Sequence, residues 1–212
     1  MGQNKIITIV DYNMGNIRSI AKAFNSFDVA VLISNRREDI KNADRLILPG
    51  VGAFSDGMKN LRELGLVDIL NQEVLENKKP ILGICLGMQL LARNSEEFGF
   101  HQGLGWLDAS VKKFEFKDNN FKVPHVGWNN LKVYDKKCSL LAGIKSGTDF
   151  YFVHSYHLVC RSENIVMAVC RYGKDFTAVI QKDNIFGTQF HPEKSQKFGL
   201  EILKNFISLK KC

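Results

Sequence analysis

The stretch Pro80-Ile81-Leu82-Gly83-Ile84-Cys85-Leu86-Gly87-Met88-Gln89-Leu90-Leu91 constrains the fold of this chain more than any other. The apolar run after Pro80 indicates a short buried strand, and the leucines after Cys85 indicate a helix, so Cys85 falls at the turn between them. Gly83 and Gly87 lack the Cβ atoms that would collide where a strand turns sharply into a helix. A thiol at this turn stands at a helix N-terminus, where backbone N–H groups and the helix dipole favour the thiolate.

A second segment, Gly187-Thr188-Gln189-Phe190-His191-Pro192-Glu193-Lys194-Ser195, supplies partners for such a thiol. Read alone, Cys85 could equally be a buried core cysteine. An isolated His-x-Glu is more simply interpreted as a strand-end histidine beside an unrelated surface carboxylate. A thiol nucleophile needs a base within reach, and the base needs an acceptor on its other nitrogen. We therefore predict Cys85 as nucleophile, His191 as base and Glu193 as its orienting carboxylate. The other histidines, at 101, 125, 154 and 157, lack a carboxylate two residues on.

Four motifs in one order resemble the class I, triad-type glutamine amidotransferases. They are Pro49-Gly50-Val51-Gly52, Gly-Ile-Cys-Leu-Gly-Met-Gln around Cys85, Pro124-His125-Val126-Gly127-Trp128-Asn129, and Gln-Phe-His-Pro-Glu around His191. Within that family the chain is similar to the glutaminase subunits of imidazole glycerol phosphate synthases, from Asp11-Tyr12-Asn13-Met14-Gly15-Asn16 to the C-terminal helix. The resemblance implies an α/β fold with a flavodoxin-like parallel sheet flanked by helices and an antiparallel extension in the second half.

The resemblance also implies roles for residues outside the triad. The oxyanion hole would comprise the backbone N–H of Leu86 and one from Val51 or Gly52, since the turn at Val51 can present N–H groups to an anion. Substrate-binding positions would be Gly50, Gln89, Glu97, Ser155 and Tyr156, with Glu97 taking the α-amino group; spacing alone does not separate Glu97 from Glu96. Partner-interface positions would be Asn13, Trp128 and Lys194. The family commonly has Gly where Asn13 stands, and a core position is an alternative interpretation of Trp128.

The implied activity is hydrolysis of L-glutamine to glutamate through a thioester, with no cofactor and no metal. The ammonia would pass to a (β/α)₈ cyclase subunit, in a heterodimer that makes imidazole glycerol phosphate and the aminoimidazole ribonucleotide by-product of histidine biosynthesis. Three alternatives stay open. One is a paralogous glutaminase that feeds another synthase, such as one amidinating a surface sugar. The others are a cysteine hydrolase of α/β-hydrolase type and a scaffold without turnover.

Composition excludes several other classes. The 212 residues contain no Pro/Ser/Gly-rich linker, so we expect one domain spanning 1–212. Apolar runs of about five residues fall short of the ~20 that span a membrane, and five cysteines without a C-x-x-C pair argue against disulfides and zinc. The net charge is +7, but the lysines are dispersed along the sequence and no nucleic-acid-binding motif accompanies them. We therefore expect a cytoplasmic protein that binds neither nucleic acid nor membrane.

Patterning predicts the remaining elements. The run Ile6–Val10 is apolar without alternation, as expected of a central parallel strand. We expect helices over 17–27, in one or two pieces between 58 and 74, and at the C-terminus, where Phe198, Ile202, Phe206 and Leu209 form an apolar stripe. We expect further strands over 29–33, Arg45–Leu48, 109–114, 131–133, 150–153, 165–170, 176–180 and 185–190.

Overall fold

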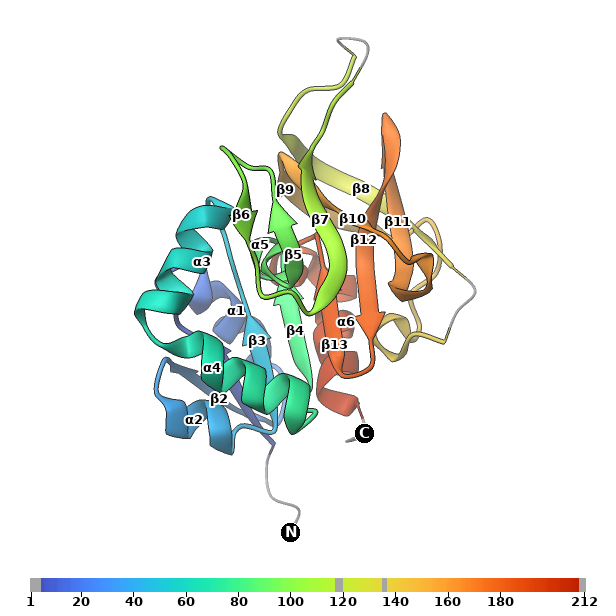
Figure 1. The fold of residues 1–212 in the computed structure, drawn as a ribbon. Coiled ribbons are helices and arrows are strands. Elements are labelled where there is room, and N and C mark those ends of the chain that lie inside the picture. Colours follow the sequence, from blue (N-terminus) through green and yellow to red (C-terminus); the bar gives the residue numbers. More distant parts are fainter. Residues whose placement is uncertain (1–4, 117–119, 135–136, 210–212) are drawn as a thin grey trace.

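The molecule is built on a nine-stranded sheet (Figure 1), in a computed structural model that describes residues 5–116, 120–134 and 137–209. Its strands, in spatial order, are β2 (Ala30–Ser34), β1 (Ile6–Val10), β3 (Arg45–Leu48), β4 (Ile81–Ile84), β13 (Ile185–Thr188), β12 (Lys174–Lys182), β11 (Val166–Tyr172), β8 (His125–Val133) and β9 (Asp149–His154). The first five pair in parallel and the rest are antiparallel. The predicted fold class is confirmed, including its antiparallel extension.

Helices cover both faces of the parallel half. Residues of α1 (Ile17–Phe24) and α6 (Gln196–Ser208) share one apolar core with Ile7 and Ile9 of β1. Residues of α2 (Arg37–Asn42), α3 (Phe54–Glu63) and α4 (Leu66–Asn71) share the other core with Val10. In Figure 1, α3 and α4 lie in front of the sheet and α1 and α6 behind it. Strand β1 contributes to both cores, which explains its continuous apolar run.

A second, four-stranded sheet covers the short helix α5 (Leu86–Leu90) that follows Cys85 (Figure 1). Its order is β10 (Tyr156–Cys160), β7 (Leu107–Lys113), β5 (Ala92–Ser95) and β6 (His101–Gln102). Leu90 of α5 and Leu107 and Val111 of β7 belong to one apolar core, so this sheet buries the elbow helix. The sequence analysis predicted β7, at 109–114, but it did not predict β5, β6 or β10.

Several predicted boundaries shift. The helix expected over 17–27 ends at Phe24, because the Asn25 N–H bonds Lys22 O in a tight turn. Strand β8 begins at His125, six residues before the predicted 131–133. Strand β13 ends at Thr188 rather than at 190, although the Gln189 N–H still bonds Ala178 O of β12 at 2.9 Å; Gln189 reaches the site described below. The predicted helices between 58 and 74 appear as α3, α4 and a π-helical turn at Gln72–Glu76.

The described helices include none that is both long and apolar enough to cross a bilayer. The outermost residues of the predicted domain, 1–4 and 210–212, lie outside the described part of the chain, as does Cys212.

Candidate active site

Cys85 occupies a sharp turn between β4 and α5. Its backbone has φ 53° and ψ −110°, a conformation that side-chain-bearing residues rarely adopt and that marks strain at functional sites. A Cβ on Gly87 would lie 1.8 Å from the carbonyl oxygen of Leu48, and one on Gly83 would lie 2.7 Å from Cα of Met88. The predicted elbow is therefore confirmed, and its glycines are required by close backbone approach.

The predicted base, His191, and its carboxylate, Glu193, are in direct contact. His191 Nδ1 and Glu193 Oε1 are 2.8 Å apart, with side chains only 2% and 1% exposed. The short 3-10 turn Pro192–Lys194 carries Glu193 back under the ring. Ser195 Oγ donates to His191 O at 2.7 Å and accepts from Tyr151 N at 3.0 Å, which ties this turn to β9.

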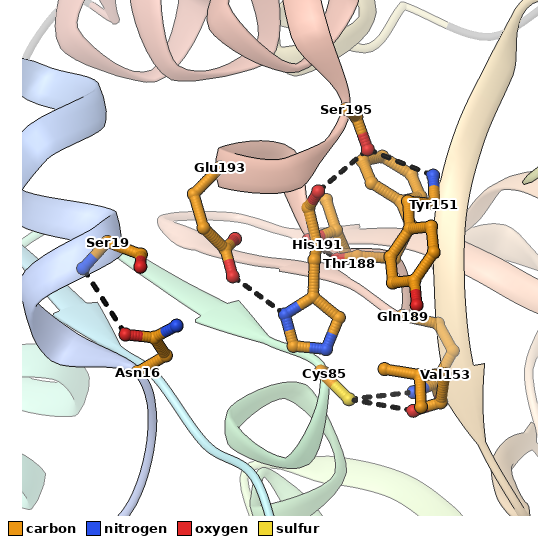
Figure 2. Close-up of polar contacts among 11 residues, drawn as sticks. Asn16, Ser19, Cys85, Tyr151, Val153, Thr188, Gln189, His191, Glu193 and Ser195 are labelled. Atoms are coloured by element: carbon orange, nitrogen blue, oxygen red, sulfur yellow. Dashed lines mark hydrogen bonds and ion pairs between the residues drawn. The ribbon is translucent and has the colours of Figure 1, made fainter. Parts of the chain in front are cut away.

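The second nitrogen of His191 is aimed at the thiol. In Figure 2 the Nε2 edge of the ring faces the sulfur of Cys85, and Nε2 is buried without a hydrogen-bond partner among the described residues. Burial lowers the pKa of His191, but interaction with Cys85 and Glu193 outweighs burial and raises this pKa to about 10. The site therefore favours the imidazolium form of His191, with the carboxylate of Glu193 at Nδ1 and the sulfur of Cys85 facing Nε2.

A cleft of about 380 Å³ opens over Cys85. Nine predicted site residues line it, together with Val153 and His154: Val51, Gly52, Cys85, Leu86, Gln89, Glu97, Ser155, Tyr156 and Lys194. Gly50 is not in the wall. It is buried beneath the turn, where an added Cβ would lie 2.7 Å from Cβ of Leu86, so its position is explained by packing against the elbow helix.

The structure separates the two candidate glutamates. Glu97 is buried in the cleft wall, and its Oε2 accepts from the Phe54 N–H at the start of α3 at 2.6 Å. Burial raises the pKa of Glu97, and the bond from Phe54 opposes that rise. Glu96 is exposed and pairs with Lys112 at 3.1 Å. Glu97 is thus the carboxylate that can reach a ligand above Cys85.

Amide side chains link the cleft to the sulfur. Gln89 Nε2 donates to Tyr156 O at 2.8 Å and to Gln189 Oε1 at 3.0 Å. Gln189 Nε2 in turn donates to Cys85 Sγ at 3.7 Å (Figure 2), and Gln189 is completely buried. The sequence analysis gave Gln189 no role. The available signal was its place two residues before His191, just where β13 ends.

Three other histidines lie near the site but are held neutral. His154 Nδ1 and Tyr156 O are 2.8 Å apart, and His154 Nε2 and His125 Nδ1 are 3.1 Å apart. Burial lowers the pKa of His154 to about 3 and those of His125 and His157 to about 4. A ring whose pKa is this low carries no proton to give to a leaving group at neutral pH, whereas the raised pKa of His191 suits a proton donor.

The predicted partner-facing residues do not all lie together. Trp128 is about half exposed, and its ring packs edge-on against Tyr151 with centroids 6.1 Å apart. Lys194 Nζ lies 5.7 Å from the centroid of that same tyrosine and also lines the cleft. Asn13 is exposed on the loop after β1, with φ 63°, the left-handed backbone that asparagine tolerates.

Within residues 5–116, 120–134 and 137–209, no three His, Cys, Asp or Glu side chains are grouped as metal ligands would be. The groups at the cleft are instead those of acyl transfer: a thiol, an imidazole–carboxylate pair and helix N-terminal amides.

Comparison with known proteins gives concordant results. The profile "Glutamine amidotransferase class-I" matches residues 8–209. Imidazole glycerol phosphate synthase subunit HisH 1 of Campylobacter jejuni strain RM1221 is 50% identical over 96% of this chain and all of that protein. HisH 2 of Pseudomonas aeruginosa is 46% identical over the same shares. Among solved structures, PurLQS from Thermotoga maritima superposes with a TM-score of 0.73 at 17% identity, covering 97% of this chain and 98% of that one. The crystal structure of a glutamine amidotransferase superposes with a TM-score of 0.69 at 23% sequence identity, and the match covers 94% of this chain and 96% of that one.

Proposed function

The chain belongs to the class I glutamine amidotransferase family, and from that premise we propose that it is the glutaminase subunit of an imidazole glycerol phosphate synthase. It hydrolyses the side-chain amide of L-glutamine and supplies ammonia for histidine biosynthesis. The observation that carries this proposal is the constellation of a strained cysteine, a buried His191–Glu193 pair and a cleft above them, in a chain 50% identical to such a subunit.

In the proposed reaction the Cys85 sulfur attacks the carboxamide carbon of glutamine. A C–S bond forms, the C–N bond breaks, and His191 delivers its proton to the departing nitrogen as ammonia. Water, deprotonated by His191, then hydrolyses the thioester to glutamate and restores the thiolate and imidazolium. The elevated pKa of His191, about 10, supports the role of proton donor in the first half of this cycle. Glu193 stabilises the imidazolium and fixes the ring.

The tetrahedral oxyanion is assigned to the backbone N–H of Leu86 and one from Val51 or Gly52. Leu86 is the first residue of α5, where the N–H groups have no intrahelical partner. The turn at Val51 and Gly52 lies in the wall of the same cleft. Removing one donor of this kind costs ~3 kcal/mol of transition-state stabilisation in comparable enzymes.

The glutamine substrate is assigned to the residues lining the cleft. Glu97 would bind the α-amino group through Oε1, since its Oε2 already accepts from Phe54. Both protons of the Gln89 amide are used by Tyr156 O and Gln189 Oε1, so Gln89 has only its carbonyl oxygen to offer. That oxygen suits the –NH₂ of the substrate carboxamide. Ser155 and Tyr156 complete the opposite wall.

Ammonia has to reach a synthase without equilibrating with water, where it would be protonated and lose nucleophilicity. We assign the acceptor to a (β/α)₈ cyclase subunit, which forms a heterodimer with this chain and carries the lyase step. The exposed Trp128, Lys194 at the cleft rim and Asn13 on the β1 loop are the proposed contacts.

The coupling is tested by glutamate release with and without the purified cyclase and its ligand. We expect low activity alone and a large rise in the complex. Trp128→Ala should weaken that activation, whereas Leu32→Ala, an exposed apolar residue on the β2 edge at the other end of the sheet, should not. Equal rates with and without the cyclase would contradict the pairing, and activation by a different synthase alone would favour the paralogous pathway.

A further inference from the structure

The amide of Gln189 is placed between two groups of the catalytic site, although it belongs to neither the triad nor the cleft wall. Its side chain is completely buried, with Oε1 3.0 Å from Gln89 Nε2 and Nε2 3.7 Å from Cys85 Sγ. A buried glutamine costs free energy unless its polar atoms are paired, so two such specific contacts indicate that position and orientation are both determined.

The direction of these hydrogen bonds follows from one backbone carbonyl. Tyr156 O can only accept, so the group of Gln89 that faces it must be the –NH₂. The second proton of that –NH₂ then points at Gln189, which must present its oxygen. The remaining end of Gln189, its own –NH₂, is thereby turned toward the sulfur.

The carbonyl that sets this order is itself held in place. His154 Nδ1 donates to Tyr156 O, His154 Nε2 accepts from His125 Nδ1, and His125 Nε2 accepts from Asn129 Nδ2 at 3.3 Å. These roles follow from the lowered pKa values of both rings, which keep them neutral at neutral pH and so define their tautomers. Tyr156 O therefore accepts from two sides: from the histidine pair that begins on β8, and from Gln89, whose second proton continues the hydrogen bonds through Gln189 to the nucleophile.

We propose that Gln189 is a further catalytic residue, whose side-chain N–H stabilises the sulfur anion of Cys85. As a thiol, Cys85 can donate to Val153 O at 3.8 Å. As a thiolate it has no proton to give, and the Gln189 N–H is then the neutral donor that stabilises the charge. His191 also faces the sulfur, and Glu97, His154 and Lys194 share its cleft. The buried Tyr12 phenol donates to Pro49 O and interacts with Cys85 electrostatically. This inference deepens the proposed function and rests on it for its link to turnover.

The direct test measures thiolate formation without substrate. The rate of Cys85 alkylation by iodoacetamide is followed against pH, with the modified peptide quantified by mass spectrometry. Gln189→Met removes both polar atoms. Gln189→Glu keeps an oxygen for Gln89 but replaces the donor by a carboxylate. We expect the midpoint of Cys85 ionisation to rise by about one pH unit or more in both variants, since a hydrogen bond to a charged group is lost.

Gln181→Met is the matched control, because Gln181 is a partly buried glutamine on β12 that does not line the cleft over Cys85. It should keep the wild-type midpoint. A purely structural role for Gln189 would lower the melting temperature and leave the midpoint unchanged, and that result in folded variants would overturn the proposal. Since alkylation needs no glutamine, a shifted midpoint in an enzyme without glutaminase activity would reject the proposed function and retain this inference.

A second measurement uses the native sequence, in case the variants fail to fold. The side-chain ¹⁵N–¹H resonances of Gln189 should titrate with the Cys85 midpoint in the wild-type protein and lose that transition in Cys85→Ala. Resonances that show no transition in the wild-type protein would overturn the proposal.

Discussion

The imidazole of His191 and the carboxylate of Glu193 are separated by one proline in the sequence and joined by a 2.8 Å contact between Nδ1 and Oε1. The 3-10 turn between them makes this pairing local, so it needs no long-range rearrangement to form. Only the approach of the pair to Cys85, more than a hundred residues earlier, depends on the tertiary fold. That approach is set by β4 and β13, which are neighbours in the parallel sheet and deliver the two segments to one edge.

Glu193→Gln should lower the pKa of His191 from about 10 toward the ordinary value near 6.5, because the carboxylate that stabilises the imidazolium is lost. Cys85→Ala should lower the pKa of His191 as well, since interaction with the Cys85 sulfur also raises it. NMR titration of the His191 ring measures both shifts. Because the folded-state pKa is raised, its contribution to stability is complete below ~6.5 and disappears as the pH rises toward 10. An unchanged pKa in both variants would mean that the ring is not paired as described.

Glu97→Gln should raise KM for glutamine by roughly tenfold to a hundredfold, as expected for losing a charged hydrogen bond to the substrate ammonium. The adjacent Glu96→Gln is the matched control, because Glu96 is exposed and pairs with Lys112. Steady-state kinetics, with the proposed cyclase partner present, compares the two variants. Equal effects of the two substitutions would remove Glu97 from the substrate site.

Gly87→Ala should destabilise the fold by about 3 kcal/mol, because the new methyl group would lie 1.8 Å from the carbonyl oxygen of Leu48. Gly143→Ala is the comparison, since Gly143 has φ 76° and nothing within 4 Å of an added Cβ. It should cost only about 1 kcal/mol through its backbone conformation. Denaturant unfolding measures both. A small loss at Gly87 would mean that β3 and the elbow helix are not in close contact.

The buried histidines predict a loss of stability in acid. Their folded-state pKa values, about 3 for His154 and about 4 for His125 and His157, lie below the unfolded value near 6.5, so the unfolded chain binds more protons. The free energy of unfolding should therefore fall as the pH drops from ~6.5 toward these values. His157→Phe should reduce that slope, because it removes a titrating ring whose Nε2 is buried without a described partner. A variant with the wild-type acid slope would contradict this.

Much of the site could be predicted from sequence because its chemistry is encoded in short local patterns. The glycines beside Cys85 could be explained from the sequence, because the strand–turn–helix pattern already predicts that the two backbones approach closely there. The neighbouring glutamates could not be separated, since their difference lies in whether the chain buries one of them against the start of α3. The substrate-binding role of Gly50 stays a prediction; the structure shows that its Cα packs closely against the elbow helix and Tyr12.

The short strands β5 and β6 of the second sheet and the role of Gln189 could not be predicted from the sequence, for a different reason. Strands β5 and β6 are only four and two residues long and are polar or mixed, so they carry too little periodicity to be recognised. Gln189 belongs to a recognised motif, but its role depends on Gln89, a hundred residues away, and on the carbonyl of Tyr156. Contacts of that range appear only once the fold is assembled.

The central claim is that Cys85 is a nucleophile presented to a glutamine-shaped cleft. It is tested most directly with a glutamine analogue that carries an electrophilic diazoketone in place of the carboxamide, followed by mass spectrometric mapping of the adduct. The other described cysteines have pKa values raised by burial, to about 11 for Cys160 and about 12 for Cys170, and Cys138 is raised as well. We predict one adduct, on Cys85, that glutamine protects against and that Cys85→Ala abolishes. An unmodified Cys85, or an adduct that survives Cys85→Ala, would contradict the account.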